Sequence, residues 1–362
     1  MIQLKDLCQK ASSNIAQKDL EGHEGQYPIY GASGLIGYVD FYKQEKPYVA
    51  EVKDGAGNGR VMCLPEKSSV IGTMQYILPN EGVNVHYLAF AMEHKNLAKY
   101  FSGATIPHIY FKDYGKEKLL ERTEKEQKSI AEILSKMDSL ISLRKQQIAK
   151  LDELVKARFV EMFGNIIRND KSWPIHNFSD IASSRLGKML DAKQQTGKYS
   201  YPYLANFNVQ WFNFNVDNLN QMDFNEAEQK EFELRDGDLL VCEGGEIGRC
   251  AVWHNEIQPC FFQKALHRVR CNRQLVQPDY LAWWFKYNCN HGGFAEIAGA
   301  KATIAHLPGI KLKQLQVALP PLSLQNEFAA FVERVDQQKQ TVQQSLDRLE
   351  LMKKALMQEY FG

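Results

Sequence analysis

The stretch Ala104-Thr105-Ile106-Pro107-His108 recurs 198 residues later as Ala302-Thr303-Ile304-Ala305-His306. The same offset continues without a gap and ends on Glu161-Met162-Phe163-Gly164 against Glu359-Tyr360-Phe361-Gly362. Identical residues between these ends are Gln127/Gln325, Ala131/Ala329, Asp138/Asp336, Gln146/Gln344, Leu151/Leu349 and Lys156-Ala157/Lys354-Ala355. Self-similarity at one fixed period is the signature of a repeat architecture. The chain is therefore predicted to be a tandem duplication.

Each repeated segment is predicted to form one long helix, because apolar residues recur along it alternately four and three positions apart. The stretch from about 126 to 162 contains no Gly or Pro, and as a helix it would span roughly 55 Å. Pro320-Pro321 block helical continuation from upstream, and Ser323 is the predicted N-cap of the second helix. The predicted helix-pairing residues are Ile130, Leu134, Met137, Ile141, Ile148, Leu151 and Val155 in the first helix, interrupted at Arg144, and Phe328, Val332, Val335, Val342, Leu346, Leu349 and Leu356 in the second, interrupted at Lys339 and Lys353.

A seam of this kind requires a helical partner. The first helix leads the chain away from the first globular block, and the second helix begins at the second block. We therefore expect the two helices to pair antiparallel, with one globular domain at each end. The alternative is that each helix packs on its own domain.

The remaining sequence forms two weakly similar blocks, at 1–118 and 166–318, with the helical regions at 119–165 and 319–362. Each block has a Tyr-Pro-aromatic strand signal, Tyr27-Pro28-Ile29-Tyr30 in the first and Tyr201-Pro202-Tyr203 in the second. Each also has a strand that runs into a Gly-rich turn. Because strand and helix signals are mixed, we predict two α/β (α+β) domains separated by a long antiparallel two-helix coiled coil, as a pseudo-twofold tandem repeat.

The charge balance and the cysteine content exclude few classes of protein. Lys+Arg 44 against Asp+Glu 43 leaves a net charge of +1, so a nucleic-acid-binding surface would have to be a local one. The seven cysteines are scattered and include no Cys-x-x-Cys pair, which favours buried thiols over zinc or disulfides. Neither a signal peptide nor an apolar membrane-spanning stretch is recognisable, which favours a soluble protein of the cytoplasm.

Catalytic motifs are scarce. The sequence contains neither a phosphate-binding Gly-x-x-x-x-Gly-Lys-Ser/Thr loop nor an Asn-Pro-Pro-aromatic run of the kind that clamps an amine for methyl transfer. Asp40, Glu51 and Lys53 offer an alternative, a Mg²⁺-dependent nuclease site. The corresponding strand of the second block, Leu240-Val241-Cys242, carries neither carboxylate nor lysine. We therefore expect no catalytic residue and no metal site.

The chain resembles the DNA-specificity subunits of type I restriction-modification enzymes over essentially its whole length. The resemblance is carried by Gly237-Asp238-Leu239-Leu240-Val241, by Gly244-Gly245-Glu246-Ile247-Gly248-Arg249 and by Leu319-Pro320-Pro321-Leu322-Ser323-Leu324-Gln325. The first repeat keeps only Gln127 of the Pro-Pro-Leu-x-x-Gln pattern, with Leu119-Leu120-Glu121-Arg122 where the prolines would fall. That departure leaves the start of the first helix less defined.

The resemblance implies two target recognition domains, each reading one half of a split sequence in double-stranded DNA, and a helical spacer that docks two methyltransferase subunits. Those subunits would bind S-adenosylmethionine, and motor-nuclease subunits would bind ATP and Mg²⁺, so this chain is expected to hold no cofactor. It also implies the cytoplasm of a bacterium or archaeon. A coiled-coil adaptor without DNA specificity remains a further alternative.

Residues 199–215 interleave aromatic residues with Asn and Gln, which can bond adenine in the major groove, although a β-hairpin with core aromatics would show the same pattern. Other candidates are polar or basic residues of the turn-rich parts. The predicted nucleic-acid-binding residues are Lys53, Asn58 and Arg60 in the first domain, and Arg185, Lys188, Gln194, Gln195, Lys198, Asn206, Asn208, Gln210, Arg249 and Lys301 in the second.

Overall fold

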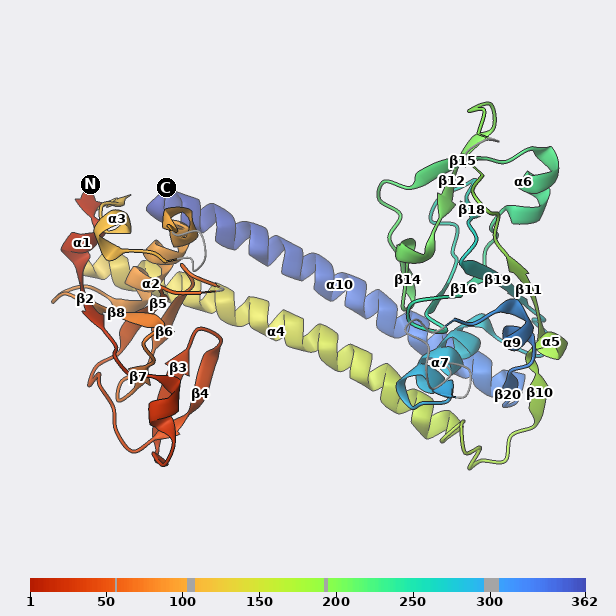
Figure 1. Ribbon diagram of the computed structural model, residues 1–362, viewed down its shortest axis with the longest axis horizontal. Coiled ribbons are helices and arrows are strands. Elements are labelled where there is room, and N and C mark those ends of the chain that lie inside the picture. The colour runs from red at the N-terminus through yellow and green to blue at the C-terminus, as the bar shows by residue number, and fades with distance from the viewer. Residues whose placement is uncertain (56, 103–107, 192–194, 296–305) are drawn as a thin grey trace. The chain divides into compact units, whose positions relative to one another are not determined.

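The structure is a computed structural model that describes residues 1–55, 57–102, 108–191, 195–295 and 306–362 (Figure 1). The Ala-Thr-Ile start of each repeat therefore lies outside the described residues, whereas His108 and His306 lie within them. The chain divides into two compact units, one comprising Met1–Ile148 with Thr341–Gly362 and the other Ala149–Gln340. The boundaries predicted for the helical regions, 119–165 and 319–362, stay predictions, because this division cuts both long helices.

The first unit contains a mixed domain built on one four-stranded and one three-stranded sheet. Their strand orders are β2-β8-β5-β6 and β4-β3-β7, and β1 pairs with β9. The bounds are β1 Ile2–Gln3, α1 Leu4–Leu7, β2 Cys8–Ser12, η1 Gln17–Leu20, β3 Tyr27–Gly31, β4 Gly34–Val39, β5 Tyr48–Val52, β6 Val61–Leu64, β7 Ser69–Val70, β8 Met74–Pro79, α2 Val85–His94, η2 Leu97–Tyr100, α3 Phe111–Tyr114 and β9 Lys118–Leu119.

The domain of the second unit repeats this plan, with sheet orders β11-β19-β16-β17 and β15-β12-β18 and with β10 paired to β20. The bounds are β10 Ile175–Asn177, α5 Phe178–Ile181, β11 Ala182–Leu186, β12 Ser200–Leu204, η4 Asn206–Asn208, β13 Val209–Gln210, β14 Asn213–Phe214, β15 Asn220–Asp223, α6 Glu226–Phe232, β16 Leu239–Cys242, β17 Cys250–Val252, β18 Phe261–Phe262, β19 Leu266–Cys271, α7 Pro278–Asn290, α9 Gly309–Lys313 and β20 Gln316–Ala318.

Strand register confirms the duplication. In the first domain β3 pairs parallel with β7, so that Tyr30 lies opposite Val70. In the second domain β12 pairs parallel with β18, so that Leu204 lies opposite Phe262. We call residues at matching register positions equivalent. The domains differ after these strands, because β3 turns directly into β4, whereas the β13–β14 hairpin lies between β12 and β15.

Two helices of 40 residues each, α4 (Glu124–Phe163) and α10 (Leu322–Phe361), confirm the predicted long helices. α4 begins at a capping box, in which Thr123 Oγ1 accepts from the Glu126 N–H and Glu126 Oε2 accepts from the Thr123 N–H. Ser323 lies inside α10, whose first backbone bonds reach the Pro321 carbonyl. The predicted cap at Ser323 is therefore wrong, because the helical turn already starts at the second proline.

In each unit the two helices pair antiparallel, which confirms the predicted pairing. The first unit joins early residues of α4 to late residues of α10, with Lys353–Asp138 and Lys145–Glu350 ion pairs that both measure 2.8 Å. The second unit joins late residues of α4 to early residues of α10, with Lys339–Asp152 at 2.6 Å. The predicted seam residues that are buried are Ile130, Leu134, Met137, Val155, Phe328, Val332, Val335, Val342 and Leu346, and those half-buried are Ile141, Ile148, Leu151, Leu349 and Leu356.

The far end of each helix packs on a domain. Phe361, the last residue of α10, is fully buried with its ring 5.2 Å from that of Tyr87 in α2. Phe163, the last residue of α4, is fully buried with its ring 4.8 Å from that of Tyr280 in α7. The two Phe-Gly ends of the repeat thus perform the same packing role. None of the described helices combines the length and the apolar composition needed to cross a membrane.

Candidate nucleic-acid interface

The structure collects many of the predicted DNA-contacting residues at one end of each domain. In the first domain this end is the β5–β6 turn, which holds Lys53, Asn58 and Arg60. In the second domain it is the β16–β17 turn, which ends on Arg249, together with η4. Arg60 directly precedes β6 and Arg249 directly precedes β17, so the two arginines are equivalent.

The first turn is held by charged and polar contacts. Lys53 has a side chain that is only 20% exposed, with its ammonium 3.8 Å from Asp54. The Asp54 carboxylate also contacts Nδ1 of His108, the described end of the first repeat stretch. The Asn58 side-chain nitrogen is buried and has no hydrogen-bond partner among the described residues. Arg60 is exposed, and its guanidinium donates to the Ala32 carbonyl at 2.9 Å.

At the second turn, Arg249 donates through Nη2 to both the carbonyl and the side-chain oxygen of Asn206, at 3.0 and 3.1 Å. Asn206 in turn donates to the Gly244 carbonyl at 3.1 Å. Asn208 is buried, and its amide is satisfied inside the protein, since it accepts from the Ala205 N–H and donates to the Asn215 carbonyl. Gln210 is exposed next to Phe207, a residue that is 62% exposed. The Gln210 side chain donates to the Phe207 carbonyl at 3.1 Å, so at this end Gln210 and Phe207 form an exposed polar and aromatic pair.

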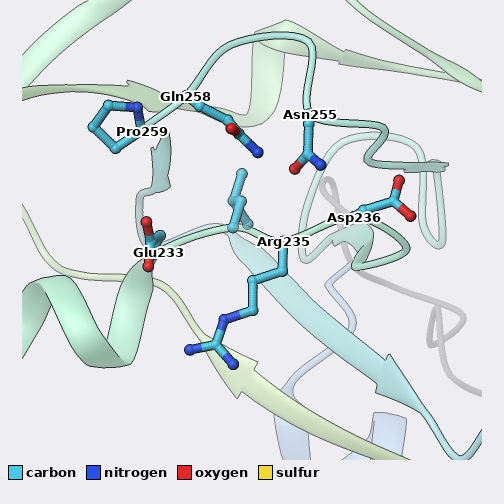
Figure 2. A pocket seen from close by; sticks show the side chains of 7 residues that line it. Glu233, Arg235, Asp236, Asn255, Gln258 and Pro259 are labelled. Carbon is cyan, nitrogen blue, oxygen red and sulfur yellow. The ribbon is translucent and has the colours of Figure 1, made fainter.

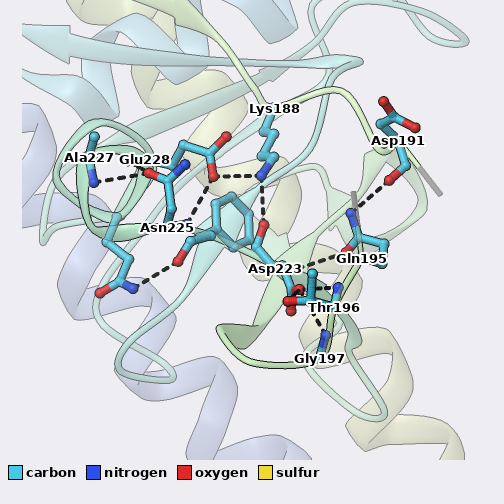
Figure 3. A network of polar contacts seen from close by, with 11 residues as sticks. Lys188, Asp191, Gln195, Thr196, Gly197, Asp223, Asn225, Ala227 and Glu228 are labelled. Atoms are coloured by element: carbon cyan, nitrogen blue, oxygen red, sulfur yellow. Dashed lines mark hydrogen bonds and ion pairs between the residues drawn. The ribbon is translucent and has the colours of Figure 1, made fainter. Parts of the chain in front are cut away.

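Figure 3 shows that two further candidates belong to an internal network. The Lys188 ammonium, on a side chain 12% exposed, contacts Glu228 at 2.6 Å and the Asp223 carbonyl at 2.7 Å. Gln195 accepts from the Asp223 N–H and donates to the Asp191 carbonyl. Lys188 thus joins the segment before β12 to the end of β15 and to α6, and Gln195 joins that segment to the end of β15. A DNA contact by either residue would compete with these bonds.

The other candidates differ in their surroundings. Lys198 is exposed, with its ammonium 5.0 Å from the centroid of the Tyr199 ring. Arg185 forms an ion pair with Glu231 and lies over the Phe232 ring. Gln194 and Lys301 lie outside the described residues. DNA contact by these residues stays a prediction.

The three residues of the alternative nuclease site are engaged by separate partners. Asp40 accepts from His23 at 2.8 Å, and Lys53 faces Asp54. Glu51 is fully buried and accepts from the Tyr114 hydroxyl at 3.1 Å, and burial raises its pKa to about 7. Within the described part of the chain, no three His, Cys, Asp or Glu side chains cluster as metal ligands would. A fully buried carboxyl with a raised pKa is poorly suited to holding Mg²⁺.

A shallow pocket lies elsewhere in the second domain (Figure 2). It is lined by Glu233, Leu234, Arg235, Asp236, Asn255, Gln258 and Pro259. These residues precede β16 or follow β17, so the pocket lies at the opposite end of that hairpin from Arg249. None of the predicted contact residues lines it.

The sequence pattern of residues 199–215 includes Phe207 without singling it out, and sequence reasoning missed the internal bonds of Arg60 and Arg249. The twofold repeat held a signal for the arginines, since each follows a Gly-rich turn and directly precedes the returning strand. It held no signal for their acceptors, because Ala32 lies 28 residues from Arg60 and Asn206 lies 43 residues from Arg249.

Two copies of one α/β topology, each joined to an antiparallel helix pair and each presenting a polar loop-built end, define a tandem-repeat recognition protein. A family model described as the type I restriction modification DNA specificity domain matches residues 1–153 and 170–351. The chain belongs to this family.

Individual relatives agree with that assignment. The chain is 22% identical over 333 residues to a protein of Haemophilus influenzae named as a putative type I restriction enzyme specificity subunit. This match covers 86% of the chain and 80% of that protein. It is 23% identical over 195 residues to a protein of Methanocaldococcus jannaschii named as the MjaX specificity subunit, but that match spans only 46% of the relative. Among solved structures, the type I restriction-modification S subunit from M. genitalium shares the fold, with a TM-score of 0.66 at 15% identity over 100% of this chain and 95% of that one.

Proposed function

We propose that this chain is the DNA-recognition subunit of a type I restriction-modification complex, and that each domain reads one half of a bipartite target in double-stranded DNA. The observation that carries the proposal is a pair of domains with one strand order and register but different loops at the equivalent end. Because the two domains share one strand framework, each can approach the DNA groove in the same way. Because their loops differ, each can contact different bases.

The helices support a spacer role. α4 and α10 each run unbroken from one unit into the other, and they pair antiparallel within each unit. A paired helix is stiff, so it fixes both the separation and the rotational phase of the two half-sites, as in dimeric repressors. The unread gap in the target is then a property of helix length.

One flank of the helix pair supports docking of two methyltransferase subunits. Lys145 and Asp152 directly follow seam positions of α4, and they line a flank that ion pairs with α10 occupy. Residues that directly precede seam positions line the opposite flank. In the first unit the exposed apolar ones include Ile133, 37% exposed, Leu140, 43% exposed, and Met352, 54% exposed.

In the second unit the corresponding residues are Leu154, 48% exposed, and the half-buried Phe331. The repeat offset relates Ile133 to Phe331 and Leu154 to Met352. Two equivalent apolar patches suit two copies of one partner, and small exposed apolar patches with polar surroundings are typical of protein interfaces.

Catalysis then belongs to the partners. The methyltransferase subunits would bring S-adenosylmethionine, and motor-nuclease subunits would bring ATP and Mg²⁺, in the cytoplasm of the host cell. The Mg²⁺-nuclease alternative lacks support, because Glu51 is buried and engaged by Tyr114.

The test is to co-express the chain with the methyltransferase encoded beside it and to map modified bases across genomic DNA. A split motif with a fixed gap is the expected result. Unmodified DNA or a continuous motif would contradict the proposal.

A further inference from the structure

Arg60 and Arg249 make the same contact in the two domains. Each donates a guanidinium N–H to a backbone carbonyl, Arg60 to Ala32 at 2.9 Å and Arg249 to Asn206 at 3.0 Å. The acceptors are also equivalent, because Ala32 lies two residues after Tyr30 and Asn206 lies two residues after Leu204. The bond is thus preserved between two loops that otherwise differ in length and sequence.

A second equivalent pair fixes the other side of each turn. Gly59 and Gly248 directly precede the arginines and have φ values of +81° and +76°. A Cβ on Gly59 would lie 2.4 Å from the Ala98 backbone nitrogen, and one on Gly248 would lie 2.9 Å from the Phe285 ring. Each turn is therefore packed against the segment that follows the four-stranded sheet, while its arginine holds the loop that leaves the three-stranded sheet.

A third contact joins the repeated histidines to the same turns. His108 pairs as an isolated β-bridge with Asp54, and His306 does so with Gly244. In the second domain Asn206 adds a side-chain bond to the Gly244 carbonyl, whereas Ala32 has no side chain that can do so. The turn, the loop after β3 or β12 and the segment at the histidine consequently form one bonded cluster in each domain.

We propose that Arg60 and Arg249 are positioning residues, each of which clamps the Gly-rich turn to the loop after β3 or β12 and so sets the base-reading geometry of its own domain. The inference rests on the proposed function. Both hydrogen bonds of Arg249 go to Asn206, and the residue is half-buried. A DNA phosphate could contact its guanidinium only by replacing these bonds. The exposed groups Phe207 and Gln210 lie on the loop that Arg249 clamps. Loss of the clamp would therefore blur base readout.

The experiment uses the complex with the neighbouring methyltransferase and measures modification rates on target DNA with single mismatches in either half-site. The variants are Arg249→Met, Arg249→Lys and Arg60→Met. Arg249→Met should lower discrimination in one half-site by about tenfold, the equivalent of one good hydrogen bond to a charged group, and Arg60→Met should lower it in the other half-site. Arg249→Lys should not restore it, since a single ammonium cannot reproduce the planar guanidinium donor set.

Asn206→Ala is the matched control, because it gives the second domain the residue that the first domain already has at Ala32. It keeps the carbonyl acceptor, so its loss of discrimination should be clearly smaller than that of Arg249→Met. Arg60 is exposed, so Arg60→Met carries the test even where Arg249→Met lowers the yield of folded chain.

A phosphate contact predicts a different pattern, in which affinity falls equally for all sequences and the salt dependence weakens by about one counterion. That result, or discrimination by both Arg249→Met and Arg60→Met that equals the discrimination of a wild-type complex with a split motif, would overturn the clamp. Absence of a split motif in the wild type would instead contradict the proposed function.

Discussion

Gln325 in α10 accepts a hydrogen bond from the backbone N–H of Gln277, the N-cap of α7, at 2.9 Å. Its repeat counterpart Gln127 in α4 accepts one from Asn84, the N-cap of α2, at 3.1 Å. Each glutamine also donates to the carbonyl five residues upstream, that of Pro320 or Arg122. Both side chains are buried, so one glutamine per repeat ties the start of a long helix to its domain.

Replacing Gln325 by Leu should therefore destabilise the second unit. It would leave the Gln277 N–H and the Pro320 and Leu275 carbonyls without their side-chain partner, at a cost of about 2–4 kcal/mol. Urea unfolding followed by far-UV circular dichroism measures the change. Gln344→Leu, at an exposed position of the same helix, is the control and should change stability by less than about 0.5 kcal/mol. Equal effects of the two substitutions would refute the tie.

Glu51 should make the first unit less stable as the pH rises. Burial raises its folded pKa to about 7 from the ordinary 4.5, so the folded state retains a proton that the unfolded state has lost between these values. The stability that this proton provides is complete below about pH 4.5 and is lost as the pH rises through about 7. Glu51→Gln keeps an acceptor for Tyr114 without the charge, so it should exceed the wild type at pH 8 by on the order of 3 kcal/mol and match it at pH 4. A pH-independent difference between the two proteins would contradict the raised pKa.

Phe361 should contribute more to stability than any exposed residue of α10. Its ring is fully buried against Tyr87, so Phe361→Ala should cost about 3–4 kcal/mol. Leu351→Ala on the same helix removes a side chain that is 69% exposed and should cost less than about 0.5 kcal/mol. Thermal unfolding of the two variants beside the wild type gives both numbers, and a small loss for Phe361→Ala would show that the helix end does not depend on this packing.

The two apolar patches should each hold one methyltransferase subunit. Met352→Asp and Leu154→Asp introduce a charge into one patch each, so either variant should assemble with one partner subunit instead of two. Light scattering of the purified complex reports the mass. Leu351→Asp, beside Met352 on a different face of the helix, should still bind two subunits. Full assembly of both patch variants would exclude this flank as the docking surface.

The duplication was predictable from sequence because identical residues recur at one fixed offset, and the helix pairing was predictable because it depends on the local spacing of apolar residues. Ile130 and Phe328 are seam residues in the sequence and are buried in the structure. Individual contact residues were less predictable, because their partners are remote. The sequence suggests that Lys188 is an exposed cation. In the structure its ammonium is paired with Glu228, which lies 40 residues further along the chain. The Ser323 cap failed for a local reason, since Pro321 already provides the first helical acceptor.

The gap between the two modified half-sites should depend on the length of the helix pair. Residues 142–148 and 342–348 form facing heptads, joined by the Arg144–Ser345 hydrogen bond, so deleting both preserves the seam. The deletion shortens each helix by about 10 Å, the length of about three base pairs. The complex should then modify the same two half-sites with a gap about three base pairs shorter. A gap that stays unchanged in the deleted protein would contradict a helical spacer between two DNA-reading domains.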